Sequence, residues 1–282
     1  MTYNELWHLL APTYGDGEAK AIAQMVYEVR FGLSLSDIYL GKDTQLSANS
    51  QAELAGIAER LQHQEPVQYI LGEASFCGRT FHVAPGVLIP RPETAELCQW
   101  ISQKHPVADG SPFCPHILDI GTGSGCIAIT LALDIPHSQV TAWDISPAAL
   151  EIARKNAQQL NADVTFEEVD ILSPITHHHS PFDIIVSNPP YICNKEREQM
   201  EQNVLEHEPH TALFVPDEDP LLFYRTIAAY GLTALKPGGT LYFEINPIYA
   251  NEMLEMLSAM SYHDIEIKED QFGKPRMINA QR

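Results

Sequence analysis

The feature that most restricts the fold is a regular alternation of strand-like and helix-like segments from His116 to the end of the chain. The apolar run "VTAWDI" is followed by the amphipathic run "PAALEIARKNAQQL", and "LFYRTIAAYGLTAL" is followed by "GGTLYFEI". Such strand–helix repeats favour a sheet that is mainly parallel, because each helix returns the chain to begin another strand in the same direction. The sequence therefore predicts a doubly wound α/β fold for this region.

The first 66 residues have a different character, with apolar residues spaced by three and four positions. This spacing in "NELWHLL", "EAKAIAQMVYEVRFG" and "NSQAELAGIAERLQ" predicts short amphipathic helices, the last of them capped by Ser50 and Glu53. Residues 67–92 are rich in β-branched, aromatic, Gly and Pro residues, which favours a strand-rich linker or hairpin. We thus expect a helical bundle over 1–66, this linker over 67–92 and the α/β domain over 93–282.

The charge balance limits the partners that the chain can bind. Lys and Arg number 17 against 37 Asp and Glu, a net charge of −20. Binding to a phosphate backbone relies on basic side chains that displace counterions, so we expect no direct nucleic-acid binding. No apolar run reaches the roughly 18 residues of a membrane span, and the N-terminus lacks the pattern of a signal peptide. These features predict a cytoplasmic protein without a membrane partner.

Cysteine and histidine usage gives no sign of a metal centre. The five cysteines form no C-x-x-C pair, which favours reduced thiols over disulfides or a zinc site. The run His177–His179 lies between Pro174 and Pro181 without a second cluster of ligands, and we interpret it as a solvated loop. We therefore expect no bound metal.

The stretch "DIGTGSG" joins an apolar strand to a helix and has the features of a nucleoside-binding loop. Its glycines allow a sharp turn and a close approach of the backbone to a ligand, and the helix N-terminus adds free N–H groups. Asp144 ends the next strand, where a carboxylate can accept hydrogen bonds from ribose hydroxyls.

The glycine spacing and Asp119 select the kind of nucleoside. The pattern is G-x-G-x-G, whereas dinucleotide sites have G-x-G-x-x-G. Asp119 would repel a pyrophosphate but suits the sulfonium and ammonium groups of S-adenosyl-L-methionine, and D-x-G-x-G-x-G resembles motif I of Rossmann-type methyltransferases. We therefore predict this cofactor, with S-adenosyl-L-homocysteine as product, and a binding loop formed by Asp119, Gly121, Thr122, Gly123, Ser124 and Gly125.

A second motif, "NPPY" from Asn188 to Tyr191, ends the fourth strand of the alternating region and should lie beside the glycine loop. Its prolines lack N–H groups and leave carbonyl oxygens unpaired. The Asn188 side-chain oxygen and the Pro189 carbonyl suit the two N–H groups of a planar –NH2, with the Tyr191 ring against its plane. An amide or aminopurine nitrogen is a poor nucleophile, so positioning and polarisation would provide most of the catalysis. Asn188 carries no charge and is not a general base.

With further motifs in order, the chain resembles the HemK/PrmC family of protein-(glutamine-N5) methyltransferases. The resemblance covers nearly the full length and includes "LIPRPETAEL", "ILDIGTGSG", "NPPYI", "HEPHTAL" and "FGKPRMI". It implies a class I methyltransferase with a seven-stranded sheet. It also implies methyl transfer from S-adenosyl-L-methionine to the side-chain amide of a glutamine, in the GGQ motif of class I peptide chain release factors.

By this resemblance, several residues acquire expected roles. The loop Gly121–Gly125, Asp144, Asp170 and Ile171 would contact the cofactor, together with Asn188. The target glutamine would contact Asn188, Pro189, Pro190 and Tyr191. Arg91 and Glu93 remain open between a place in the site and a role in pinning the linker.

The same sequence leaves one alternative activity and one question of specificity. "NPPY" also occurs in N6-adenine methyltransferases, so methylation of an exocyclic amine of a nucleic acid is the alternative, although the acidic composition disfavours it. Free glutamine offers the same amide as a protein glutamine, so protein specificity needs contacts remote from the reacting group. We expect the bundle over 1–66 to dock the release factor.

Overall fold

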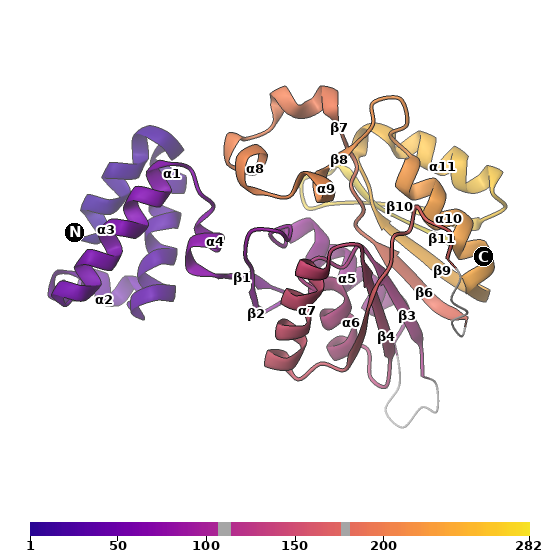
Figure 1. The fold of residues 1–282 in the computed structure, drawn as a ribbon, viewed down its shortest axis with the longest axis horizontal. Helices are drawn as coiled ribbons and strands as arrows, with labels where there is room; N and C mark the ends of the chain where they lie inside the picture. The colour runs from indigo at the N-terminus through magenta and orange to yellow at the C-terminus, as the bar shows by residue number, and fades with distance from the viewer. Residues whose placement is uncertain (107–113, 176–180) are drawn as a thin grey trace. The chain divides into compact units, whose positions relative to one another are not determined.

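The computed structural model describes residues 1–106, 114–175 and 181–282, so the run His177–His179 lies outside the described residues. The chain divides into two compact units (Figure 1). One comprises Met1–Glu73 with Glu201–His207, and the other comprises Ala74–Met200 with Glu208–Arg282. Within the described residues, no helix has the length and apolar character needed to cross a membrane.

The first unit is built from helices around a small apolar core. Its elements are α1 (Tyr3–Phe31), α2 (Leu35–Tyr39), η1 (Lys42–Gln45), α3 (Ala48–Gln62), α4 (Val67–Leu71) and α8 (Gln202–His207). Its core is formed by fully buried side chains that recur at helical spacing, including Leu6, Leu10, Val26, Tyr27, Leu54 and Leu61. The capping box predicted at Ser50 is wrong, because α3 begins three residues earlier and the Ser47 hydroxyl accepts from the Ser50 amide.

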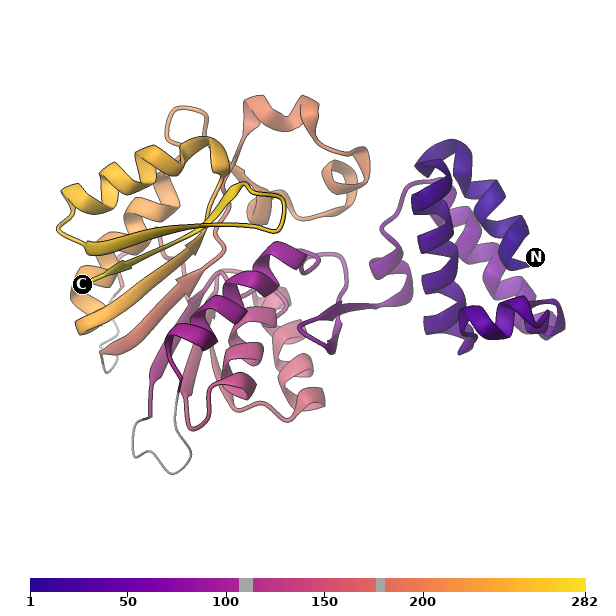
Figure 2. The ribbon, with the colours of Figure 1, turned by 180° about the vertical axis from the view of Figure 1, so that it is seen from behind.

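The second unit contains a seven-stranded sheet of order β10-β11-β9-β6-β3-β4-β5. Its strands are β3 (His116–Ile120), β4 (Gln139–Asp144), β5 (Val164–Glu168), β6 (Phe182–Ser187), β9 (Leu235–Glu244), β10 (His263–Glu269) and β11 (Pro275–Gln281). Strands β5, β4, β3, β6 and β9 run parallel, and β11 is antiparallel to both β9 and β10. Figure 2 shows the molecule from behind, with the C-terminal strands β10 and β11 in yellow. The predicted doubly wound, mainly parallel sheet is confirmed.

Helices cover both faces of this sheet and bury two separate apolar clusters (Figure 1). One face carries α5 (Pro92–Lys104), α6 (Cys126–Asp134) and α7 (Pro147–Leu160), and the other carries α10 (Leu222–Ala234) and α11 (Ala250–Ala259). Successive side chains of a strand point to opposite faces, so Ile117 joins the first cluster and Leu118 joins the second. This explains why the strands are apolar at nearly every position rather than alternating.

The strand order reverses at β3, and this point defines where a ligand can bind. Strand β3 pairs with β4 on one side and with β6 on the other, so Ile120 stands in register with both Trp143 and Ser187. The segments that follow these strands therefore emerge at the same sheet edge, which is the usual ligand site of doubly wound sheets.

Shorter elements surround this edge. They are the hairpin of β1 (Glu73–Phe76) and β2 (Arg79–His82), the parallel pair β7 (Ile192–Cys193) and β8 (Phe214–Val215), and the short helices η2 (Asn194–Gln199), α9 (His210–Leu213) and η3 (Pro247–Tyr249). The helix α4 precedes the hairpin within the predicted strand-rich linker. It starts after Pro66 and ends at Gly72, whose φ of 78° stops a helix.

Asn156 on α7 ties the hairpin to the sheet domain and is fully buried. Its side-chain oxygen accepts from the His82 amide at 2.7 Å, and its nitrogen donates to the carbonyls of His82 at 3.0 Å and Ser124 at 2.9 Å. One side chain thereby satisfies the backbone N–H and carbonyl of His82, the last residue of β2, and a carbonyl of the glycine loop.

We predict that Asn156→Ala lowers the free energy of unfolding by about 3 kcal/mol, near 1 kcal/mol for each buried hydrogen bond that is lost. Urea denaturation checks this value, with Gln159→Ala, an exposed substitution on the same helix, as the control. Equal stability of the two variants would show that the hairpin does not depend on Asn156.

Candidate active site

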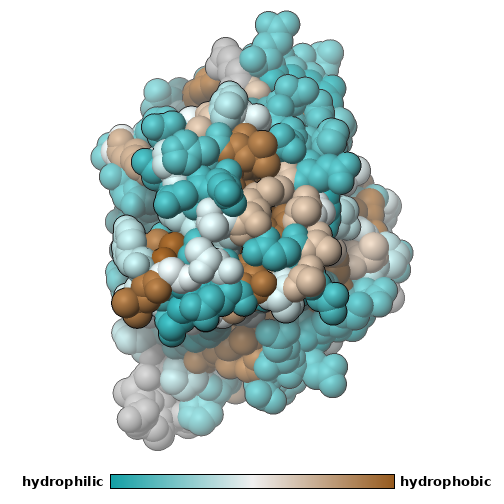
Figure 3. All heavy atoms as spheres, turned by 90° about the vertical axis from the view of Figure 1, so that its left-hand side faces the viewer, coloured by the Kyte–Doolittle hydropathy of each residue, from teal (hydrophilic) through white to brown (hydrophobic). Residues whose placement is uncertain are grey.

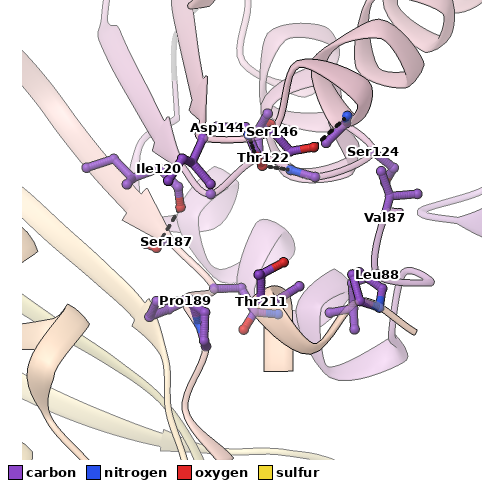
Figure 4. Close-up of a pocket in the computed structure, with 18 of the residues that line it drawn as sticks. Val87, Leu88, Ile120, Thr122, Ser124, Asp144, Ser146, Ser187, Pro189 and Thr211 are labelled. Atoms are coloured by element: carbon purple, nitrogen blue, oxygen red, sulfur yellow. Dashed lines mark hydrogen bonds between the residues drawn. The ribbon is translucent and has the colours of Figure 1, made fainter. Parts of the chain in front are cut away.

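A cavity of about 380 Å³ lies at the carboxyl ends of β3, β4 and β6 (Figure 4). Six chain segments form most of its wall: the glycine loop, the turn after β4, the turn after β5, the Asn188–Pro190 segment, and two loops from outside the sheet. Those two loops contribute Gly86, Val87, Leu88, Pro90 and Arg91 on one side and Pro209, Thr211, Ala212 and Phe214 on the other. The cavity therefore collects segments that are far apart in the sequence.

The glycine loop is held against the end of β4 by its own backbone. The amides of Gly121 and Thr122 donate to the Trp143 carbonyl at 2.8 and 2.9 Å, and the Gly123 amide donates to Asp144 Oδ2 at 2.8 Å. Gly125 has a φ of 81°, and a Cβ there would stand 2.9 Å from Ile129 Cδ1 and 3.1 Å from Ala153 Cβ. A side chain at this position would collide with α6 and α7, so the close packing of the loop requires glycine.

Asp119 supports this loop from behind instead of facing the cavity. It is fully buried, and its Oδ2 accepts from the Thr122 hydroxyl at 2.6 Å and from the Ala128 amide at 3.2 Å. Its Oδ1 has no hydrogen-bond partner among the described residues, and burial raises the pKa of this carboxyl to about 7. An unpaired buried acceptor next to the loop suits a cationic ligand or a bridging water at this end of the cavity.

Asp144 lies on the cavity wall, between the glycine loop and the turn after β4. Its Oδ1 accepts from the Ser146 amide at 2.9 Å, which holds the carboxylate in place, and burial raises its pKa. Beyond it, Ile145, Asp170, Ile171 and Leu172 continue the wall. Asp170 shapes its own turn by accepting from the Leu172 amide and the Ser173 hydroxyl. This side combines carboxylates with apolar side chains, as a ribose and a purine ring require.

The Asn188 segment forms the opposite wall and is anchored at its start. The buried Ser187 hydroxyl donates to the Ile120 carbonyl at 2.6 Å, the bond drawn in Figure 4. Asn188, Pro189 and Pro190 line the cavity. Asn188 Nδ2 donates to the Thr94 hydroxyl at 3.1 Å, so its Oδ1 is the amide atom left to accept from a ligand.

Tyr191 supports this wall instead of lining it. Its hydroxyl donates to Glu244 Oε1 at 3.0 Å, and burial together with the Glu244 charge raises the pKa of the phenol. Glu244 ends β9, is 2% exposed, and also accepts from the Thr94 hydroxyl at 2.6 Å. Burial raises the pKa of Glu244, and the two hydrogen bonds oppose that rise.

A second buried carboxylate joins the two outer loops of the cavity. Glu208 accepts from the Ile89 amide at 3.2 Å and forms an ion pair with Arg91. The Glu208 side chain is 1% exposed, whereas Arg91 is 34% exposed and lines the cavity. Arg91 thus lines the cavity and also joins its own loop to Glu208, the two possibilities that the sequence left open. Glu93 is half-buried, and its charge raises the pKa of Glu244.

Sequence reasoning missed Thr94, Glu208 and Glu244. A signal existed for Glu244, because a charged residue ends the otherwise apolar run "TLYFEI". Within the described ranges, no group of three His, Cys, Asp or Glu side chains gathers as metal ligands, and the five cysteines are unpaired.

Comparisons with known proteins agree with this geometry. Two sequence-family models match the chain: the PrmC N-terminal domain over residues 8–72 and the methyltransferase small domain over residues 108–212. The release factor glutamine methyltransferase of Bacteroides thetaiotaomicron is 52% identical over 97% of this chain and 96% of that protein. The protein of the same name from Flavobacterium psychrophilum is 42% identical over 96% and 94%.

Solved structures share the fold at low sequence identity. A methyltransferase from Pyrococcus furiosus superposes with a TM-score of 0.53 at 18% identity, covering 83% of this chain and 98% of that one. The T. thermophilus 16S rRNA N2 G1207 methyltransferase, solved with AdoMet and guanosine, gives a TM-score of 0.52 at 18% identity over 74% of this chain and 49% of that one.

The sheet order, the glycine loop and the cavity at the reversal of strand order define a class I methyltransferase that uses S-adenosyl-L-methionine. The fitting features are the cradle at Gly125, the unpaired Asp119 oxygen and the Asp144 carboxylate on the wall. Within this class, the chain belongs to the release factor glutamine methyltransferase family, as its 52% identity to a full-length relative shows. The resemblance to HemK/PrmC proteins is confirmed.

We predict that Gly125→Ala costs more stability than the same change at Gly238. Both glycines have φ near 80°, which penalises any side chain, but no atom lies within 4 Å of a Cβ at Gly238. Overpacking against α6 and α7 should add about 1–3 kcal/mol at Gly125 only. Urea denaturation of both variants checks the difference. Equal losses would mean that the loop is not closely packed at Gly125.

Proposed function

We propose that the chain transfers the methyl group of S-adenosyl-L-methionine to the side-chain amide nitrogen of a glutamine in a class I peptide chain release factor, within its GGQ motif. The observation that carries the proposal is the orientation of Asn188, which leaves its carbonyl oxygen as an acceptor on the cavity wall, near the glycine loop. The names of the relatives support the release factor as substrate. A substrate of this kind implies work in the cytoplasm without direct binding to nucleic acid.

The cofactor is assigned to the wall opposite Asn188. We assign the backbone of the glycine loop to its methionine part, Asp144 to the ribose hydroxyls, and Asp170 with Ile171 to the adenine side. Asp119 acts beneath the loop through its unpaired oxygen. The full proposed set is Asp119, Gly121, Thr122, Gly123, Ser124, Gly125, Asp144, Asp170, Ile171 and Asn188.

The target amide is assigned to the Asn188 wall. One N–H of the glutamine –NH2 donates to Asn188 Oδ1 and the other to the Pro189 carbonyl, while Pro190 shapes the wall. Tyr191 holds this wall through Glu244 and presents its ring from behind. Two acceptors draw the N–H groups into one plane and turn one face of the nitrogen towards the cofactor.

Methyl transfer needs an electrophile and a correctly placed nitrogen. The bound cofactor supplies a sulfonium methyl group. The acceptors Asn188 and Pro189 stabilise the positive charge that develops on the amide nitrogen as the new N–C bond forms and the C–S bond breaks. Asn188 is uncharged and takes no proton, so the proton leaves the nitrogen only after it has become cationic and acidic.

The alternative, methylation of an exocyclic amine of a nucleic acid, is disfavoured by the names of the relatives and by the net charge of −20. A methylation assay that offers release factor, DNA and rRNA with radiolabelled cofactor separates the two. Label in the release factor that disappears when its target glutamine is replaced by asparagine supports the proposal.

We predict that Asn188→Ala lowers kcat on the release factor by roughly 10²–10³, as expected when one acceptor at a developing charge is removed. Cofactor affinity, measured by calorimetry, should change far less. Asn251→Ala, an exposed substitution on α11, is the matched control and should keep full activity. Parallel losses of affinity and rate in Asn188→Ala would instead show that Asn188 acts mainly in cofactor binding or in stabilising the structure, and not on the target amide.

We also propose that the helical region 1–66 docks the release factor. Tyr39 and Leu40 are 84% and 75% exposed, which is high for large apolar side chains. Figure 3 shows apolar groups exposed in separate patches on an otherwise polar face of the molecule. Remote contacts of this kind provide the binding energy that distinguishes a protein glutamine from a free one.

Surface substitutions test this role more directly than deletion, because Glu201–His207 belongs to the same unit as the N-terminal helices. We predict that Tyr39→Ser with Leu40→Ser raises KM for the intact release factor about tenfold, the scale of losing one hot-spot contact. KM for a short glutamine peptide should not change. Leu254→Ser, which is 40% exposed on α11, is the control. An unchanged KM for the release factor would remove this pair from the docking surface.

A further inference from the structure

A continuous chain of hydrogen bonds links Asn188 to a carboxylate buried beneath it. Asn188 Nδ2 donates to Thr94 Oγ1 at 3.1 Å, and Thr94 Oγ1 donates to Glu244 Oε2 at 2.6 Å. The other oxygen of Glu244 accepts from the Tyr191 hydroxyl at 3.0 Å. Thr94 belongs to α5 and lines the cavity, whereas Glu244 stands at the end of β9, which packs on α5, and does not line the cavity.

Counting donors and acceptors shows that the hydrogen bonds from Asn188 to Glu244 can run in only one direction, which we call their polarity. An ionised carboxylate only accepts hydrogen bonds, so both Thr94 and Tyr191 must donate to Glu244. The Thr94 hydroxyl has a single proton, and it donates this proton in the hydrogen bond to Glu244. Its oxygen can only accept, and the group of Asn188 that faces it must be the –NH2. The opposite amide orientation would bring two oxygens together with no proton between them, inside a buried site.

We propose that Glu244, acting through Thr94, sets the amide orientation of Asn188 and so makes the active site selective for an –NH2 donor. Thr94 and Glu244 are positioning residues in this proposal, since both act on the target amide through Asn188. The inference rests on the proposed function, because it explains how the Asn188 oxygen comes to face the target glutamine. An inverted Asn188 would present its own –NH2 to the substrate –NH2, and two donors repel.

The same polarity accounts for discrimination between glutamine and glutamate. A glutamate carboxylate in the cavity would bring acceptors against Asn188 Oδ1 and the Pro189 carbonyl, which leaves no hydrogen bond to form. Charged groups around Glu244 are Arg276, whose charge favours its ionised form, and Glu93, whose charge opposes it. Arg276 is itself held by Asp270 at 3.2 Å. The ionised carboxylate is thus favoured by groups from three separate parts of the chain, Thr94, Tyr191 and Arg276.

The first test removes the relay without changing its shape. Thr94→Val should lower kcat on the release factor about 10–100-fold, while the Kd for S-adenosyl-L-methionine stays within about twofold of the wild-type value. Thr94→Ser, which keeps the hydroxyl, should recover kcat to within about threefold. Thr130→Val, the same change at a fully buried threonine outside the cavity wall, is the matched control for packing. Full kcat in Thr94→Val would overturn the proposal.

The second test inverts the polarity instead of deleting it. In Asn188→Asp alone, the carboxylates at 188 and 244 compete for the one Thr94 proton, and activity should fall. In the double variant Asn188→Asp with Glu244→Gln, the new amide donates to Thr94, and Thr94 donates to the new Asp. The other Asp oxygen again faces the cavity, so kcat should be at least about tenfold above that of Asn188→Asp alone. A double variant no more active than Asn188→Asp would overturn the proposal.

A third readout is independent of the protein substrate. In ¹⁵N-labelled protein, the Asn188 side-chain –NH2 signal, assigned by its loss in Asn188→Ala, should exchange slowly in the wild type and in Thr94→Ser. It should exchange at least about tenfold faster in Thr94→Val. Absence of methylation of the release factor by the wild type would refute the proposed function. A methylating wild type whose amide exchange and kcat match those of Thr94→Val would refute this inference alone.

Discussion

The pairing of β3 with β4 on one side and β6 on the other is the constraint on which the rest of the site depends. It puts Ile120 level with Trp143 and with Ser187, so three segments leave the sheet at one height. The glycine loop then bonds across to the end of β4, and the Ser187 hydroxyl bonds across to the end of β3. A slip of one residue in either pair would turn the side chains at these ends to the opposite face of the sheet.

Buried carboxylates hold the walls that this register brings together. Asp119 supports the glycine loop, Glu208 joins the two outer loops, and Glu244 supports the Asn188 segment. A buried charge is expensive unless its oxygens accept hydrogen bonds, and loss of one partner costs far more than an equivalent change at the surface. Glu208 and Glu244 therefore tie distant segments together with a defined geometry, whereas Asp119 fixes the loop that follows it. Among these three carboxylates, Asp119 Oδ1 is the one oxygen without a hydrogen-bond partner among the described residues.

Much of the cavity wall was predictable, because it is formed by residues that are neighbours within short motifs. The loop residues Gly121–Ser124 and the segment Asn188–Pro190 do line one cavity, as the strand order in the sequence indicated, whereas Gly125 does not line it. Asp119 and Tyr191 belong to the same motifs, yet the structure places both behind the wall. For both residues, the motif predicted correctly which part of the fold they occupy. The direction of each side chain depended on its hydrogen-bond partners, which are the nearby Thr122 and Ala128 for Asp119 but the distant Glu244 for Tyr191.

By itself the sequence determined the class of fold, the glycine loop and the proline segment that follows β6, because strand propensity, glycine turns and proline restraints act within a few residues. It did not reveal that Ser47 caps α3 or that Val67–Leu71 is helical, since both depend on boundaries that neighbouring signals leave ambiguous. Only the tertiary structure decided how Asn188 is oriented. Thr94 is 94 positions from Asn188 and 150 from Glu244. Such a bond exists only after the sheet has formed and α5 has packed on it, because side chains so distant along the chain have no local geometry to bring them together.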